Sequence, residues 1–199
     1  NNKYANFWSV GSSWDMHKDL LNRNKTVSSL KLRASVGTSG NDFIGDFASQ
    51  SLYGYRSQIT YAGSTAPYLT RGENEDLTWE KNFNVNGGID YGFFNNRITG
   101  TVDYYVRTTK DLLNNKPIPL TSGFAELVSN IGDFRNEGIE ISLHTVNIKN
   151  QSFTWTTDFN FANNKGTVLS LSDDKDILSN SGSTVFKAGS AIRSFYIVD

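Results

Sequence analysis

Asp90 and Asp103 are the residues of this 199-residue chain whose type and placement come closest to a catalytic pair. Two carboxylates that share a site can perform general acid and base catalysis. Both, however, fall on the polar side of alternating segments, where a carboxylate is more often a hydrogen-bonding group or the lining of a wet cavity. We therefore expect Asp90, Asp103 and their neighbours Tyr105 and Arg107 to be polar lining residues with a possible role in ligand binding, and not catalysts.

The other candidates for chemistry are weaker. His17 falls in a turn and His144 on a polar strand face, so both are expected to be ordinary polar residues. Asp173, Asp174 and Asp176 form an acidic group that lacks the glycine and the bidentate glutamate of a calcium loop, which indicates a solvated loop. Motifs for nucleotides, zinc hydrolysis and serine hydrolysis are absent. The sequence thus predicts no catalytic residue, no metal, no cofactor and no enzymatic activity.

Composition excludes further classes. A net charge of -1 gives no electrostatic basis for binding nucleic acid. The chain contains no cysteine, so disulfides and thiolate sites are excluded. No apolar run approaches the ~18 residues of a membrane-spanning helix. A search for long apolar runs does not detect transmembrane β-strands, because they alternate apolar and polar residues.

Alternation of apolar and polar residues with a period of two dominates the chain and predicts β-strands. The segments are 7–14, 30–37, 77–93, 98–107, 139–145, 153–161 and a seventh that begins near 191. A helical turn is expected around Leu20 and Leu21. The longest segment has Leu, Trp, Phe, Val, Ile and Tyr at odd positions and mostly Asn, Thr and Asp at even positions.

Asn95 and Asn96 predict a two-residue hairpin turn, because asparagine tolerates the positive φ of a type I′ turn. The turn makes paired residue numbers sum to 191, so Ile89 faces Val102 and Gly88 faces Asp103. Apolar and polar faces then never mix, which supports this register. The same register suggests that Tyr104 covers the bare backbone of Gly87.

The connections alternate in length, with long polar loops expected at 38–76, 110–135 and 163–190. Outer-membrane barrels have short periplasmic turns and long extracellular loops, and aromatic residues at both interfaces. Here Trp8 and Trp79 would lie at the outer end of the strands, and Trp14, Phe93 and Trp155 at the periplasmic end. The pattern predicts an all-β fold, namely an antiparallel transmembrane β-barrel segment of about seven strands in contact with outer-membrane lipid.

Seven strands cannot close a wide barrel, and open edges in lipid are very costly. We therefore expect the chain to be an internal fragment whose remaining strands lie elsewhere in a longer polypeptide. The alternative is a soluble or surface β-sandwich that binds glycans, since sandwiches use the same alternation. A structural or adhesion barrel without transport is a third possibility.

Several stretches resemble the SusC/RagA family of TonB-dependent transporters from Bacteroidetes. They are LKLRASVGTSGND (30–42), LTWEKNFNVNGGIDYGFFNNRITGTVDYYVRTTKDLL (77–113), PLTSGF (119–124), NIGDFRNEGIEISL (130–143), FTWTTDFNFANNKGTVLSL (153–171) and GSAIRSFY (189–196). Departures are small: family members often carry Asn-Pro where this chain has Asn74-Glu75, and Gly where it has Ile197. The plug domain and the TonB box of the family fall outside residues 1–199.

The resemblance implies that residues 1–199 are part of a barrel domain of about 22 strands in the outer membrane of a Gram-negative bacterium. It implies import of oligosaccharides or peptides, driven by the TonB complex through parts outside this chain, with a SusD-like surface lipoprotein as partner. Ligand contacts would come from the upper lumen and from the first long loop, which holds Tyr53, Tyr55, Tyr61 and Tyr68. Those tyrosines could equally pack on the lipoprotein or on neighbouring loops.

Overall fold

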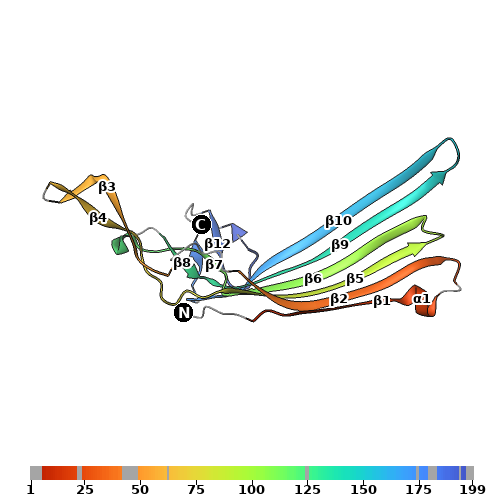
Figure 1. Cartoon of the computed structure of the whole chain (residues 1–199), viewed down its shortest axis with the longest axis horizontal. Helices are drawn as coiled ribbons and strands as arrows, with labels where there is room; N and C mark the ends of the chain where they lie inside the picture. The colour runs from red at the N-terminus through yellow and green to blue at the C-terminus, as the bar shows by residue number, and fades with distance from the viewer. Residues whose placement is uncertain are drawn as a thin grey trace.

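Six long strands of the computed structural model lie side by side in one antiparallel sheet of order β1-β2-β5-β6-β9-β10 (Figure 1). The strands are β1 (Ser9–Asp15), β2 (Val27–Asn41), β5 (Glu80–Phe93), β6 (Ile98–Lys110), β9 (Gly132–Lys149) and β10 (Thr154–Leu171). The structure describes residues 6–21, 24–41, 49–61, 63–123, 126–173, 175–178, 183–192 and 194–195. Each strand pairs with the next long strand along the chain, so the sheet is a simple meander.

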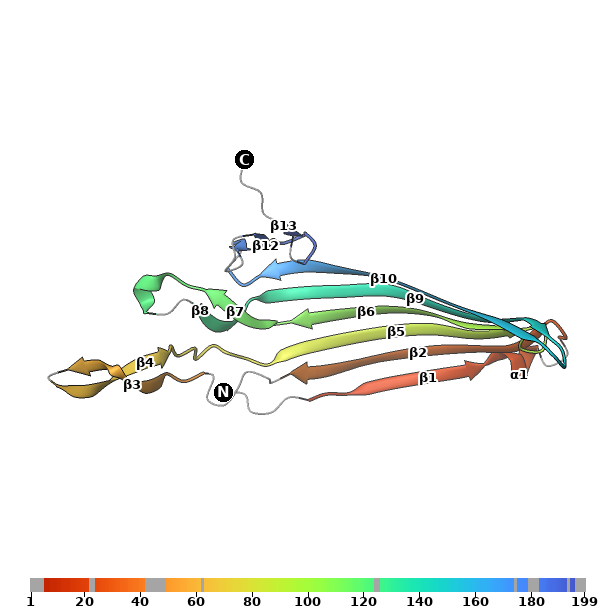
Figure 2. The ribbon, with the colours of Figure 1, turned by 90° about the horizontal axis from the view of Figure 1, so that it is seen from above.

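The two ends of the sheet differ as predicted. One end carries α1 (Met16–Leu20), which confirms the expected helical turn, and the tight turns at 94–97 and 150–153 (Figure 2). The other end carries the longer connections. These contain β3 (Leu52–Tyr61), β4 (Ser64–Arg71), β7 (Leu113–Pro117), the 3-10 helix η1 (Leu120–Ser122), β8 (Glu126–Asn130), β11 (Ile177–Leu178), β12 (Thr184–Phe186) and β13 (Ser194–Phe195). Alternation of short and long connections is therefore confirmed.

The β5–β6 hairpin has the predicted register, with Ile89 opposite Val102 and Gly88 opposite Asp103. Asn95 and Asn96 have φ values of 56° and 60°, the backbone conformation for which asparagine was expected at this turn. The turn geometry thus determines which residues of both strands share a face.

The apolar face continues unbroken across the other strands. A single cross-strand row contains Trp14, Leu32, Ile89, Val102, Ile141 and Phe161. These side chains have no second layer to pack against, and Trp14, Ile89 and Phe161 are exposed. An apolar surface this extended is far larger than a water-soluble monomer usually presents.

A β-bulge adjusts the apolar face at the start of β10. Trp155 pairs with Ile148 and Thr156 pairs with Val146, so Asn147 is left without a cross-strand partner in the register. The extra residue turns Ile148 to the side of Trp155, where strict alternation would have placed it on the polar side. The Asn147 amide donates to the Thr157 hydroxyl at 2.7 Å.

The loops predicted from the sequence are longer than the loops in the structure, because the strands extend into them. β9 and β10 continue well past 139 and 161, and the stretches 38–76 and 163–190 contain short strands of their own. The seventh run meets the large sheet only at its start within the described residues: Ala191 bridges Thr167, its neighbours hydrogen-bond to Gly166 and Val168 of β10, and β13 then pairs with β12. The extensions were missed because residues such as Asn163, Asn164 and Lys165 are polar on both faces.

A small hydrophobic core lies at the end with the long connections. Ile131, Phe134, Val168 and Leu171 are buried, and Val168 is 0% exposed. A second bulge, between Val168 and Ser170, brings Val168 and Leu171 to the same side of β10. Phe186 of β12 closes this core with an edge contact to Phe134 at 6.0 Å between ring centroids. Among the described residues, no helix has the length and apolar character needed to cross a bilayer.

Replacing Ile89 with Arg should lower the free energy of unfolding of the lipid-reconstituted protein by about 2–4 kcal/mol, because a charge would enter the middle of the apolar face. The matched control is Thr101→Arg, which places the same side chain on the polar face and should change stability little. Urea unfolding in lipid vesicles measures both. Equal destabilisation by the two variants would contradict the assignment of the faces.

Candidate functional site on the polar face

The polar face of the sheet is the surface on which cross-strand rows of hydrophilic side chains meet. One row runs through Ser13, Arg33, Gly88, Asp103 and Glu140. The next runs through Asp15, Lys31, Asp90, Thr101, Ser142 and Asn160. Charged side chains of three neighbouring strands, β2, β5 and β6, therefore lie close enough to form ion pairs.

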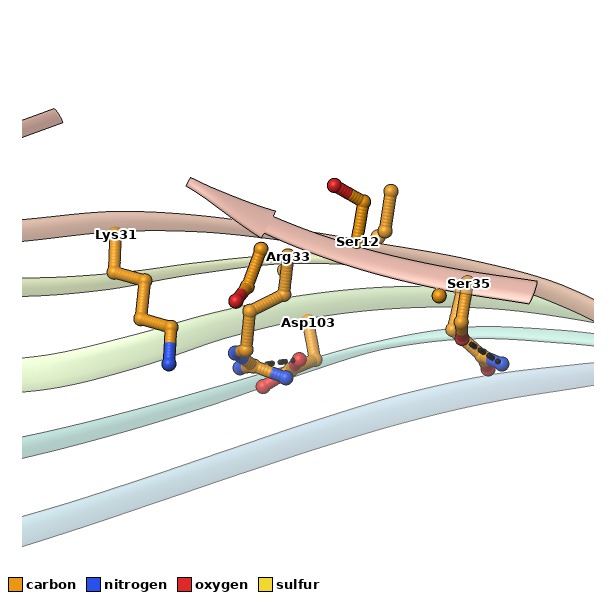
Figure 3. A pocket seen from close by; sticks show the side chains of 11 residues that line it. Ser12, Lys31, Arg33, Ser35 and Asp103 are labelled. Carbon is orange, nitrogen blue, oxygen red and sulfur yellow. Dashed lines mark hydrogen bonds and ion pairs between the residues drawn. The ribbon is translucent and has the colours of Figure 1, made fainter. Parts of the chain in front are cut away.

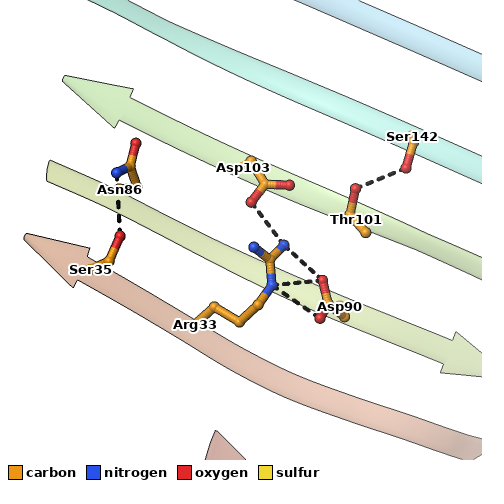
Figure 4. Close-up of polar contacts among 7 residues, drawn as sticks. All are labelled: Arg33, Ser35, Asn86, Asp90, Thr101, Asp103 and Ser142. Carbon is orange, nitrogen blue, oxygen red and sulfur yellow. Dashed lines mark hydrogen bonds and ion pairs between the residues drawn. The ribbon is translucent and has the colours of Figure 1, made fainter. Parts of the chain in front are cut away.

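Arg33 joins the two predicted carboxylates into one ion cluster (Figure 4). Its Nε donates to both carboxylate oxygens of Asp90 at 3.0 Å, and its Nη2 donates to Asp90 Oδ1 and Asp103 Oδ1 at 2.8 Å each. The planar guanidinium suits this forked contact, which a lysine could not reproduce. Asp90 and Asp103 are thus brought together as predicted, but as partners of a cation, which argues against an acid and base pair.

Gly88 provides the space for this cluster. It lies between Arg33 and Asp103 in the row, and a Cβ there would be 2.3 Å from Asp103 Oδ1 and 2.8 Å from Arg33 Nη2. A side chain at this position would force the charged ends of Arg33 and Asp103 to move from these places. The glycine therefore allows an ion pair between side chains of two strands, β2 and β6, that are not adjacent.

A shallow hollow of about 420 Å³ adjoins the cluster (Figure 3). Lys31, Arg33, Ser35 and Asp103 point to the same side of the sheet, whereas Ser12 points to the opposite side. Asn86 donates to Ser35 Oγ at 3.3 Å beside it. The hollow offers cationic, anionic and amide groups together, an arrangement suited to a polar ligand or to another polar part of the protein.

The two remaining predicted lining residues lie further along the same face. The Arg107 Nε donates to Asn84 Oδ1 at 2.8 Å, and Arg107 stays exposed. Tyr105 leans over Gly138, where an added Cβ would be 2.7 Å from the tyrosine hydroxyl. Tyr104 is paired with Gly87 but does not cover it, because a Cβ at Gly87 would approach only the Arg33 carbonyl at 4.0 Å. The expected cover of Gly87 is therefore wrong.

Other polar side chains considered in the sequence also have nearby polar partners. Thr101 and Ser142 share a hydrogen bond of 2.8 Å, and His144 Nδ1 lies 2.7 Å from Asp158 Oδ1. In the acidic loop, Asp173 pairs with Lys116, and Asp176 lies 3.9 Å from Lys187; Asp174 lies outside the described residues. No group of three possible metal ligands occurs in the part of the chain that the structure describes.

The loop tyrosines lie far from the ion cluster. Tyr53, Tyr55, Tyr61 and Tyr68 belong to the β3–β4 hairpin, which extends away from the sheet at the end opposite α1 (Figures 1 and 2). Tyr68 packs over Gly54, and the other three are exposed. The structure therefore divides the predicted site residues into a group on the polar face and a group on the hairpin.

Two residues whose side chains join several segments were not singled out from the sequence. Arg33 was recognised only as a polar residue of its segment, because the β2–β5 register cannot be counted through the 38 residues between Asn41 and Glu80. Asn130 was seen only as part of a motif. Its side chain exchanges two hydrogen bonds with the Thr78 backbone, at 2.9 and 3.0 Å, and donates to the Asp111 carbonyl at 2.7 Å. Asn130 thereby ties together the segments that enter β5, leave β6 and precede β9.

A meander of long antiparallel strands, with one apolar exposed face and one face of ion pairs and amides, is the architecture of a membrane β-barrel wall. The chain belongs to the family described as TonB dependent receptor-like, beta-barrel, whose characteristic sequence matches residues 1–185. This family consists of outer-membrane proteins of Gram-negative bacteria. The match covers the six long strands and most of the connections at the end of the sheet opposite α1.

Individual relatives agree with this assignment. TonB-dependent receptor P3 of Formosa agariphila is 36% identical over 98% of this chain, and TonB-dependent receptor SusC of Bacteroides thetaiotaomicron is 34% identical over 98%. Two solved structures, described as the RagAB peptide transporter and the RagAB peptide importer in the open-open state, superpose with TM-scores of 0.86 and 0.81 at 30% and 32% identity over 95% of this chain. The chain is thus of the SusC/RagA type. It spans about a fifth of the length of these relatives, 21% in each case.

Replacing Arg33 with Met should lower the free energy of unfolding by about 1–2 kcal/mol, because it leaves Asp90 and Asp103 facing each other without a counter-ion. Lys31→Met is the matched control. It removes a cation from the same face of the same strand and should cost less. Chemical unfolding of the lipid-reconstituted protein compares the two, and equal losses would show that net charge matters and the cluster geometry does not.

Gly88→Ala should reproduce most of the Arg33→Met loss, because the new methyl group occupies the space between Arg33 and Asp103. The control is Gly11→Ala on the same face of β1, where an added Cβ would meet its nearest neighbour at an ordinary 3.6 Å. Combining Gly88→Ala with Arg33→Met should add little further loss, since both act on one cluster. If the losses from Gly88→Ala and Arg33→Met were additive, Gly88 would stabilise the protein through something other than this ion cluster.

Proposed function

We propose that this chain is part of the barrel domain of a TonB-dependent transporter that imports oligosaccharides or peptides across the outer membrane. The observation that carries the proposal is the unmixed register of six long strands. It presents one face suited to lipid and one suited to a water-filled lumen. Family membership over residues 1–185 adds the expectation of transport. No catalytic step is proposed, so the protein acts by binding and passage.

The rest of the barrel would be supplied by strands outside residues 1–199. In the sheet of described strands, no strand pairs with the outer edge of β1, and the outer edge of β10 is bonded only near Gly166–Val168, by the segment around Ala191. Unpaired edges in lipid are very unfavourable. This chain spans 21% of SusC and of a RagAB chain, which supports further strands in a longer polypeptide, and the resemblance to the SusC/RagA family implies about 22 strands in all. A plug domain and the contact with the TonB complex would also lie in those outside parts.

A SusD-like surface lipoprotein is the proposed partner. The proposal is supported by the similarity to SusC and to the solved RagAB peptide transporter and importer, since the SusC/RagA resemblance implies such a partner. On this chain, the partner would contact the end that carries β3–β4, β7–β8 and β11–β12. The hydrophobic core around Phe134 and Val168, with the Asn130 hydrogen bonds, gives that end a stable base for such a contact.

The ion cluster of Arg33, Asp90 and Asp103 would then line the lumen, with Tyr105 and Arg107 further along the same wall. Its groups are mostly bonded to one another, which suits a wall that is permanently charged and does not itself react. We assign it the role of a polar contact surface for the material inside the barrel.

Transport is tested by deleting the gene for the complete protein and measuring uptake of fluorescent oligosaccharides and peptides by whole cells. We expect uptake of at least one of these classes to disappear, to return on complementation and to be blocked by a protonophore, because TonB-dependent import requires the proton gradient. A glycan-binding sandwich or an adhesion barrel would instead leave energy-dependent uptake unchanged. Copurification of a lipoprotein from detergent extracts tests the partner separately.

A further inference from the structure

Four positively charged side chains border the apolar face at the end of the sheet with the long connections. Lys81 of β5 is directly opposite Lys110 of β6, in the row next to that of Phe83. Arg135 of β9 shares the row of Phe83, and Lys165 of β10 lies on the same face one row further along. All four are exposed, and in the described part of the chain none of them forms an ion pair. We call Lys81, Lys110, Arg135 and Lys165 the margin cations.

The charges at this margin do not balance. Like charges directly opposite each other, as Lys81 and Lys110 are, destabilise a strand pair. Glu137 balances Lys165, which is directly opposite. The second carboxylate on this face, Asp133, already accepts a hydrogen bond at 3.2 Å from the backbone N–H that follows β6. Four cations against two carboxylates leave a surplus of positive charge, which an anion from outside the chain would neutralise.

The margin cations lie at the level of lipid headgroups. Among the described strand residues, no charged side chain occupies the apolar face in the rows from Gly87 to Phe93, so the positive charge is confined to one end. Trp8 and Phe83 lie in the row next to Lys81 and are 51% and 43% exposed. Aromatic side chains prefer the membrane–water interface, and long connections mark the extracellular end of a barrel. The surplus charge therefore faces the headgroups of the outer leaflet.

The apolar face also has a hollow of about 490 Å³ near the middle of the strands. Trp14, Ile89 and Tyr104 are exposed around it. Gly87 forms part of its floor, where an added Cβ would approach only the Arg33 carbonyl at 4.0 Å. A hollow bounded by these side chains can hold part of a hydrocarbon chain.

The distance between the hollow and the margin cations matches the depth of one leaflet. Gly87 is six residues from Lys81 along β5, which is about 20 Å at roughly 3.3 Å per residue. A membrane strand is tilted by about 45°, so this length becomes about 14 Å of depth. The hydrocarbon core is about 30 Å thick, so each leaflet contributes about 15 Å. An acyl chain whose headgroup lies at Lys81 would therefore reach the hollow.

We propose that this face binds a phosphorylated lipid of the outer leaflet. Its phosphate would lie between Lys81, Lys110 and Arg135, and one acyl chain would occupy the hollow beside Gly87. Free phosphate would leave the hollow unfilled. A second copy of this chain would bring like charges together, because a twofold contact pairs the same surface with itself. The inference goes beyond the proposed function, since it concerns a lipid that stays bound to the barrel wall whatever material the protein imports.

The test is a titration of the complete protein, delipidated in a nonionic detergent, with dimyristoyl phosphatidic acid, dimyristoylglycerol and inorganic phosphate, followed by microscale thermophoresis. Phosphatidic acid should bind roughly tenfold or more tightly than phosphate-free dimyristoylglycerol, and its affinity should fall as salt is raised. Equal affinity for dimyristoylglycerol, or no binding of phosphatidic acid, overturns the headgroup assignment. Inorganic phosphate that binds as tightly as the lipid overturns the lipid as the source of the phosphate.

The variant Lys81→Gln/Lys110→Gln should lower phosphatidic acid affinity roughly tenfold or more, because each lysine near an anionic lipid contributes to binding. Lys81→Arg/Lys110→Arg keeps the charges and should retain most of the affinity, which excludes a folding defect at these positions. Lys18→Gln/Lys25→Gln removes the same charge at the opposite end of the sheet and should have little effect. Gly87→Leu fills the hollow and should also weaken binding. Unchanged affinity in the Lys81/Lys110 glutamine variant, or an equal loss in the Lys18/Lys25 variant, overturns the proposal, and unchanged affinity in Gly87→Leu overturns the place of the acyl chain.

Discussion

Backbone hydrogen bonding is the constraint on which the rest of this structure depends. A strand in a lipid environment must pair every N–H and C=O group with a neighbouring strand, because no water is available to replace a missing partner. The pairing then determines the side-chain positions, since a slip of one residue would move a whole strand's apolar residues to the other face. In this chain the register from β1 to β10 keeps Leu32, Ile89 and Val102 in one row and Arg33, Gly88 and Asp103 in the next. The ion cluster is thus a consequence of backbone pairing.

The sequence predicted what short-range geometry controls. The β5–β6 hairpin followed from Asn95, Asn96 and the alternation on either side, and its register was correct to the residue. The alignment of β2 with β5, and of β6 with β9, could not be obtained in the same way. Long loops separate these strands, so no count of residues relates one to the other. Arg33 was therefore left without a partner in the sequence analysis, although Asp90 and Asp103 were both identified as candidates.

Limits on predicting strand ends have a related cause. Alternation identifies a strand only where its two faces meet different environments, as lipid and water do along Ile139–Leu143 and Phe159–Phe161. Toward the end with the long connections, β9 and β10 have polar residues on both faces, because both faces meet water or other loops. The alternation therefore disappears there, although the hydrogen bonds between the two strands continue. Bulges change the pattern further: Ile148 and Leu171 face the sides they do only because one residue is left unpaired before each.

Position along the strands separates two kinds of surface. The wall residues are held by hydrogen bonds to neighbouring strands, and Arg33, Asp90 and Asp103 have most of their bonding capacity occupied by one another. Such groups supply a fixed charge pattern but have little freedom to adapt to ligands. The hairpin residues have the opposite properties, because Tyr53 and Tyr55 are exposed and their backbone lies outside the large sheet. Substitutions on the hairpin can therefore leave the register that keeps the wall intact unchanged, because segments outside a rigid scaffold tolerate variation better than the scaffold does.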